Sequence, residues 1–138
     1  MRIEDLLIKH EAIRLKPYTC TAGALTIGVG RNLDSMGLSE DEVYYLLQND
    51  IRRCEKELLK AFEWFAYLDT VRQDAMMDMC FNLGISRLRG FEKALEAMED
   101  GDYEDAAVEF LDSNWADQVG QRAITITNMI RTGEYDEN

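Results

Sequence analysis

The first stretch of the chain carries apolar residues at helical spacing. Ile3, Leu6 and Leu7 share one face of a helix over residues 3–11, and acidic residues occupy its first turn, where the helix dipole favours negative charge. This pattern ends near Glu11. We therefore expect a helix whose last turn holds Glu11 and a surface or partly packed His10.

The pattern then changes to alternation. Pro17, the single proline, and several glycines mark a change of structure, and residues 25–29 alternate between large apolar side chains and threonine or glycine. This predicts a small β-hairpin with the three-residue turn Thr21-Ala22-Gly23. A third short strand is possible near residues 31–33.

Helical spacing returns after residue 38. Ser39 and Glu42 match a capping box, which predicts a long helix over about 40–60. Thr70 with Gln73 is interpreted as the cap of another helix, which stops at Gly84. Shorter helices are expected over 91–98, 102–111 and 121–131, the last ending at Gly133. The predicted fold class is therefore α+β, mostly helical, with one small sheet.

Composition limits the partners. The 138 residues suffice for one folding unit, with room for two lobes. Fifteen basic and 27 acidic side chains give a net charge of −12, which argues against nucleic acid and anionic membrane surfaces as partners. The opening residues contain acids and only a short apolar run, so neither a signal peptide nor membrane insertion is expected.

The cysteines and aromatic residues have mostly structural interpretations. Three cysteines cannot all pair within one chain, and their spacing fits no zinc motif, so we expect a reducing compartment and no metal or organic cofactor. Cys54 and Cys80 occupy apolar helical positions and are interpreted as core residues, as is Trp115. An aromatic packing cluster is expected from Phe62, Trp64, Phe65 and Tyr67.

The turn length decides which side chains share a face of the hairpin. With a three-residue turn, Cys20 lies opposite Ala24. Thr26 then lies opposite Tyr18, so Cys20 and Thr26 point to the same side. A turn one residue longer or shorter would break this relation.

Two glycines and a glutamate extend this region. Gly28 and Gly30 continue the polar face without side chains, as close approach of a ligand requires. Glu11 ends a helix, where the partial negative charge of the carbonyls favours a protonated acid. An acid beside a surface that seats substrate suits cleavage of a glycosidic bond. From these residues alone, a helix-terminal glutamate and a buried strand cysteine without catalytic roles stay an open alternative.

The segment HEAIRLKPYTCTAGALTIGVGRN, residues 10–32, resembles the phage-type lysozymes. These are the muramidases of glycoside hydrolase family 24, which include many endolysins. Glu11, Cys20 and Thr26 keep the family spacing, in which Asp or Cys follows the glutamate after eight residues and Thr follows after five more. MDMCFNLG (77–84) and SNWADQVGQRAITITNMIRTGEY (113–135) resemble its cleft segment and its C-terminal Trp, Arg and RTG pattern.

The resemblance implies a two-lobed lysozyme fold in a single domain, 1–138. A small β lobe would span about 12–38 and a connecting helix about 39–60. Residues 1–11 and about 61–138 would form the larger helical lobe.

The resemblance also implies roles for single residues. Glu11 would be the general acid that protonates the glycosidic oxygen, and Thr26 would help to hold the attacking water. Arg122 would contact Glu11. Phe81 matches an aromatic residue that contacts substrate in the cleft.

Several positions depart from the family pattern. Cys20 stands where aspartate is commoner, Ala12 where glycine often follows the glutamate, and Arg31 where histidine is frequent. No ligand role is assigned at three further sugar-contacting positions, which are Asn32, Ala94 and Glu109.

Cys20 leaves two mechanisms open. A thiol with a pKa of about 8.5 is only a few per cent ionised at neutral pH, so it acts as a base less readily than aspartate. The sulfur either orients or deprotonates water for a single displacement with inversion, or attacks the anomeric carbon as a thiolate and forms a covalent intermediate.

The resulting hypothesis is a monomeric peptidoglycan muramidase. It would serve phage or prophage lysis from the host cytoplasm, reaching the cell wall through a membrane permeabilised by a holin. The alternatives are a lytic transglycosylase and an inactive cell-wall-binding or virion structural module.

Overall fold

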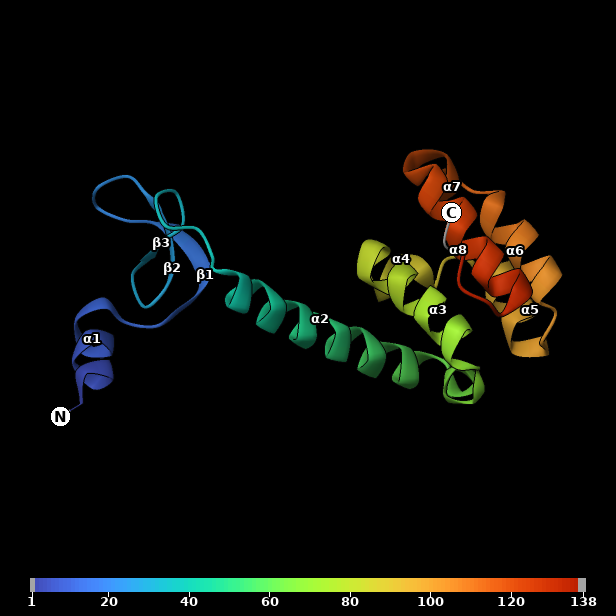
Figure 1. The fold of residues 1–138 in the computed structure, drawn as a ribbon, viewed down its shortest axis with the longest axis horizontal. Helices are drawn as coiled ribbons and strands as arrows, with labels where there is room; N and C mark the ends of the chain where they lie inside the picture. Colours follow the sequence, from blue (N-terminus) through green and yellow to red (C-terminus); the bar gives the residue numbers. More distant parts are fainter. Residues whose placement is uncertain (1, 137–138) are drawn as a thin grey trace. The chain divides into compact units, whose positions relative to one another are not determined.

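The computed structural model describes residues 2–136, and the chain divides into two compact units, Met1–Leu46 and Leu47–Asn138. Each unit has its own internal architecture (Figure 1). The expected assignment of residues 1–11 to the larger lobe stays a prediction.

The first unit contains a short helix and a three-stranded antiparallel sheet. The elements are α1 Ile3–Glu11, β1 Arg14–Thr19, β2 Leu25–Gly28 and β3 Arg31–Asn32, with strand order β1-β2-β3. Tyr18 pairs with Thr26 across the hairpin. Beside the turn, the backbone N–H of Cys20 donates to the Ala24 carbonyl oxygen at 2.9 Å. The predicted helix, hairpin register and third strand are therefore confirmed.

Helix α1 ends at a strained residue. The backbone of Ala12 has φ +64° and ψ 169°, and its N–H still donates to the Ile8 carbonyl oxygen at 2.8 Å. Ala12 is the one non-glycine residue with positive φ among residues 2–136. A side chain disfavours this region sterically, at a cost on the order of 1–3 kcal/mol.

Helix α2, Glu40–Ala61, begins with the predicted capping box. The backbone N–H of Glu42 donates to the Ser39 hydroxyl at 3.2 Å, and the backbone N–H of Ser39 donates to the Glu42 carboxylate at 2.9 Å. Two N–H groups at the helix start thereby gain partners. The long helix expected here is confirmed.

The second unit is helical. After α2 come the 3-10 helix η1 Glu63–Tyr67 and the helices α3 Thr70–Leu83, α4 Ile85–Leu88, α5 Glu92–Asp100, α6 Tyr103–Leu111, α7 Asn114–Val119 and α8 Gln121–Thr132. Helix α8 packs against α6, α3 and α7, and α5 packs against α6 (Figure 1). The stops at Gly84 and Gly133 are confirmed, whereas η1, α4 and α7 were not predicted.

The predicted cap of α3 is wrong. Asp69 is the N-cap, and its carboxylate accepts the backbone N–H of Arg72 at 3.1 Å. Thr70 is already the first helical residue. The Gln73 side-chain amide instead donates to the Phe65 carbonyl oxygen at 3.0 Å, which ties α3 to η1.

The hydrophobic core of the second unit contains the residues expected there. Cys54, Cys80 and Trp115 are 5%, 2% and 3% exposed, so their core positions are confirmed. The indole N–H of Trp115 donates to the Asn82 side-chain oxygen at 2.9 Å, which satisfies its polar atom.

The expected aromatic cluster is only partly right. Phe62 and Trp64 stack with ring centroids 5.0 Å apart and pack against the core, and Phe65 is buried. Tyr67 is 89% exposed and does not belong to the cluster.

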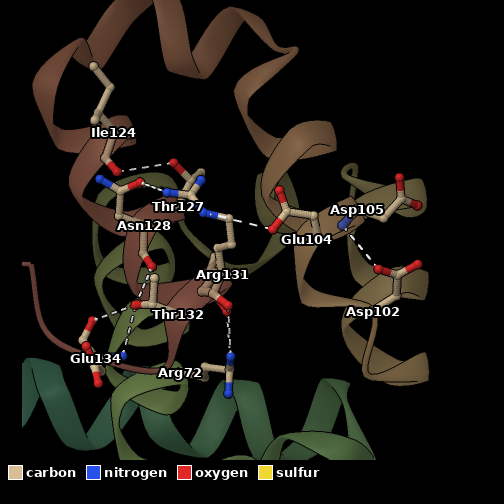
Figure 2. Close-up of polar contacts among 11 residues, drawn as sticks. Arg72, Asp102, Glu104, Asp105, Ile124, Thr127, Asn128, Arg131, Thr132 and Glu134 are labelled. Carbon is tan, nitrogen blue, oxygen red and sulfur yellow. Dashed lines mark hydrogen bonds and ion pairs between the residues drawn. The ribbon is translucent and has the colours of Figure 1, made fainter.

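Arg72 connects α3 to the C-terminal end of α8. Its Nε donates to the Ile130 carbonyl oxygen at 2.6 Å. A terminal nitrogen donates to the Arg131 carbonyl oxygen at 3.2 Å (Figure 2). The guanidinium carbon also lies 3.7 Å from the centre of the Tyr103 ring. Because the last carbonyls of a helix lack partners within it, a cation placed there stabilises the helix end.

The predicted fold class is confirmed, since residues 2–136 are mostly helical with one small antiparallel sheet. In the part of the chain that the structure describes, no helix has both the length and the apolar character needed to cross a membrane.

Candidate active site

Glu11 is the last residue of α1, and its side chain lies against the turn between β2 and β3. The residue is exposed. A Cβ atom added at Gly30 would stand 2.8 Å from Oε2 and 3.0 Å from Cδ of Glu11. The carboxyl group of Glu11 therefore occupies the space beside the Gly30 backbone. At Gly28, an added Cβ would meet no atom within 4 Å, so the space beside its backbone is open, and its contact with a ligand stays a prediction.

Cys20 lies at the end of the hairpin in an environment that favours its thiolate. Hydrogen bonds from the backbone N–H groups of Ala24 and Ala22, and then from the Thr26 hydroxyl, lower the pKa of Cys20 from its ordinary value. Burial opposes this effect only weakly, since the thiol is partly exposed. The pairing of Tyr18 with Thr26 and the bond from Cys20 to Ala24 confirm that Cys20 and Thr26 share one side of the hairpin.

Thr26 is more buried than Cys20. It is 3% exposed, and its hydroxyl donates to the Ala24 carbonyl oxygen at 2.9 Å. A hydroxyl has one proton to donate, so Thr26 can serve the Ala24 carbonyl or the Cys20 sulfur at one time. Its lone pairs stay available to accept a hydrogen bond.

Phe81 and Arg122 share a hollow of about 380 Å³ in the second unit. Phe81 is 50% exposed. Nε of Arg122 donates to the Asp78 carboxylate at 2.8 Å. The expected contact of Arg122 with Glu11 stays a prediction. The hollow has a mostly apolar lining with three charged side chains, made of Leu47, Ile51, Cys54, Asp74, Met77, Asp78, Phe81 and Arg122.

A larger hollow of about 520 Å³ lies where α4, α5, α6 and α7 meet. It brings the basic Arg87 and Lys93 together with the acidic Glu109 and Asp112. Glu109 is one of the positions at which the sequence comparison with the family assigned no ligand role, whereas Arg87, Lys93 and Asp112 come from separate segments that no local motif marks.

Among residues 2–136, no three His, Cys, Asp or Glu side chains are grouped so that they could hold a metal ion.

A small antiparallel sheet next to a glutamate, followed by a helical unit, is typical of lysozyme-type proteins. Comparison with known families supports this class. The model of the phage lysozyme family matches residues 8–131, so the chain belongs to the phage lysozyme family.

Individual relatives agree. The chain is 25% identical to "Probable T4-type lysozyme 2" of Dictyostelium discoideum, over 98% of this chain and 96% of the relative. It is 27% identical to an "Endolysin" of Acyrthosiphon pisum secondary endosymbiont phage 1, over 85% and 80%. It is also 26% identical to the "Pre-baseplate central spike protein Gp5" of Enterobacteria phage T4, over 99% of this chain and 28% of that protein.

Membership confirms the resemblance found in the sequence. The family is one of lysozymes and endolysins, which are peptidoglycan hydrolases, and this implies glycoside hydrolase chemistry at the level of the family.

Proposed function

We propose that this chain is an endolysin muramidase that hydrolyses the β-1,4 bond between N-acetylmuramic acid and N-acetylglucosamine in bacterial peptidoglycan. The observation that carries the proposal is the family match over residues 8–131, which includes Glu11, Cys20 and Thr26. The position of the Glu11 carboxyl group against the sheet that carries the other two residues supports it further.

Glu11 acts as the general acid. It gives its proton to the glycosidic oxygen, which leaves with the electron pair of the broken C–O bond. Phe81 and the open surface at Gly28 contact the sugar chain. Arg122 supports the acid.

Cys20 and Thr26 act on the nucleophile. A lowered pKa increases the thiolate fraction of Cys20 at neutral pH, and only the thiolate is a competent base or nucleophile. The thiolate removes the proton of a water held by Thr26, and this water attacks the anomeric carbon. In the other route, the sulfur attacks that carbon itself and water releases the sugar afterwards.

The acid is tested with Glu11→Gln, which keeps the shape of the side chain and removes its proton. Release of soluble fragments from purified peptidoglycan should fall by about 10²–10⁴-fold, the usual contribution of general acid catalysis. Glu4→Gln changes the same charge on the same helix and should leave the rate unchanged. Full activity of Glu11→Gln would remove the acid assignment.

Cys20 is tested by comparing two replacements. Cys20→Ala should lose activity and Cys20→Asp should retain it, because a carboxylate is a good base at neutral pH. If the alanine variant is fully active, the sulfur has no role in the reaction.

The sugar termini of the products decide the type of reaction. Hydrolysis leaves reducing ends, whereas a lytic transglycosylase leaves 1,6-anhydro-muramyl ends. Mass spectrometry of digested peptidoglycan separates the two.

A second candidate is a wall-binding or virion structural module without hydrolytic activity. The match to part of the T4 spike protein favours it. The net charge of −12 opposes attraction to an anionic cell wall, so it favours the virion structural form of this candidate over the wall-binding form. Sedimentation with peptidoglycan without release of fragments would identify such a module.

The place of synthesis and the place of action follow from the proposed muramidase function. The protein is made in the host cytoplasm as a monomer, and it reaches the peptidoglycan after a holin has permeabilised the membrane, in phage or prophage lysis.

A further inference from the structure

The side chain of the candidate acid lies close to a glycine in the turn between β2 and β3. Three side-chain atoms of Glu11 lie 2.8, 3.0 and 3.2 Å from the place where a Cβ of residue 30 would stand, and these atoms are Oε2, Cδ and Cγ. Real Cβ atoms essentially never approach other heavy atoms below 3.0 Å. The missing side chain of Gly30 is therefore a condition for the observed position of the Glu11 carboxyl group.

We propose that Gly30 is a positioning residue for Glu11, which fixes where the proton donor stands. This rests on the proposed function, because it assigns to Gly30 a role in the work of the general acid. This positioning role differs from direct contact with the sugar, since the space beside Gly30 is filled by protein atoms.

The structure shows which of the two groups in this contact moves when residue 30 gains a side chain. Gly30 lies in the turn between β2 and β3, whose two ends are held by the pairs Ile27 with Arg31 and Thr26 with Asn32. The atoms of Glu11 that meet the added Cβ belong to the far end of a flexible and exposed side chain. An alanine at position 30 therefore displaces the carboxyl group and leaves the sheet in place.

The displacement costs activity more than stability. Relieving a contact of 2.8 Å needs a shift of several tenths of an ångström or a change of rotamer. Misplacement of a reacting group by about 1 Å can cost about 10²-fold in rate.

The chain offers a matched control. Gly30 has φ +70° and Gly37 has φ +60°, so alanine is strained at both positions. At Gly37 an added Cβ meets no atom within 4 Å. Gly30→Ala and Gly37→Ala therefore both place a side chain at positive φ, and only the first displaces Glu11.

The experiment measures kcat and KM on soluble peptidoglycan oligosaccharides for both variants. We expect Gly30→Ala to lower kcat by about 10–10²-fold, with KM changed less than about twofold, while Gly37→Ala keeps both values. Three results would overturn the proposal: an unchanged kcat in Gly30→Ala, equal losses in both variants, or a raised KM with normal kcat, which indicates a glycine approached by substrate.

A stability measurement keeps the proposal testable whether or not Gly30→Ala folds well, and without reference to activity. Glu11→Ala removes all three atoms that the added Cβ meets. Gly30→Ala is expected to lower the thermal midpoint more than Gly37→Ala does. This extra loss should vanish when Gly30→Ala is combined with Glu11→Ala. An excess that persists shows that another contact causes it. Full activity of Glu11→Gln would overturn the proposed function and leave this measurement of the contact intact.

Discussion

The guanidinium of Arg31 and the carboxylate of Glu42 form an ion pair of 2.8 Å between β3 and the first turn of α2. The same carboxylate oxygen accepts the backbone N–H of Ser39, and Arg31 also donates to the Gly37 carbonyl oxygen at 3.1 Å. Arg31, which replaces a histidine frequent in the family, thus braces the loop that connects the sheet to α2.

The hydrogen bond from Arg31, followed by that from Ser39, lowers the pKa of Glu42 to about 2. A carboxyl with a lowered folded-state pKa stabilises the protein above its unfolded pKa of about 4.3 and loses this contribution as the pH falls through the folded value. We therefore expect Glu42→Gln to lower the thermal midpoint at pH 7. The difference from the unmodified protein should shrink between about pH 4.5 and pH 2.

Glu40→Gln is the control for this measurement, because it removes a nearby charge on α2 without touching the capping box. A difference between Glu42→Gln and the unmodified protein that stays constant down to pH 2 would contradict the ion pair as its cause.

The three cysteines should differ strongly in reactivity. Burial, together with the neighbouring Cys54, raises the pKa of Cys80 to about 12, whereas hydrogen bonds lower the pKa of Cys20. A thiol with a pKa of 12 has a thiolate fraction of about 10⁻⁵ at pH 7, and only the thiolate is alkylated. Iodoacetamide at pH 7 should label Cys20 more than about 10³-fold faster than Cys80 in the folded protein.

Peptide mass spectrometry measures this selectivity, and the protein unfolded in urea, in which all three cysteines should react, is the control. Labelling of Cys54 or Cys80 in step with Cys20 under native conditions would show that the helical core opens faster than the reagent acts.

Gly133 should be sensitive to substitution because Arg72 lies over it. A Cβ added at Gly133 would stand 2.9 Å from a terminal nitrogen of Arg72. That side chain cannot move away freely, since it is 15% exposed and bonded to the end of α8. Gly133→Ala should therefore lower the free energy of unfolding by about 1–2 kcal/mol from backbone strain and about 1–3 kcal/mol more from disturbed hydrogen bonds.

Gly101→Ala provides the comparison, because Gly101 ends α5 with φ +76° and ψ 13° while Gly133 ends α8 with φ +74° and ψ 16°. An added Cβ at Gly101 meets no atom within 4 Å. Urea denaturation of both variants isolates the effect of Arg72. Equal losses would mean that Arg72 adapts without cost.

Short-range relations were predictable from the sequence. The parity that places Cys20 and Thr26 on one side of the hairpin follows from the turn length, and the capping box of Ser39 and Glu42 spans only four residues. Where two suitable caps adjoin, as at Asp69 and Thr70, the sequence pattern does not choose between them. Helices as short as α4 and α7 contain too few residues to show a period.

Contacts between distant segments could not be predicted from the sequence. Nothing local pairs Arg72 with the carbonyls of Ile130 and Arg131, which lie 58 and 59 residues further along the chain. The fit of Glu11 over Gly30 also depends on how α1 meets the sheet. The glycine was found by its residue type, but the reason for it required the fold.

Ala12, the residue after the candidate acid, has a backbone conformation suited to glycine. Ala12→Gly would release a strain on the order of 1–3 kcal/mol without forming any new contact, although the greater freedom of glycine in the unfolded chain would offset up to about 1 kcal/mol of this. A directed-evolution campaign for heat resistance should therefore recover glycine at position 12 early. The methyl group of Ala12 limits rotation of the backbone beside Glu11. The gain in thermal stability would therefore come with a more flexible backbone next to the acid.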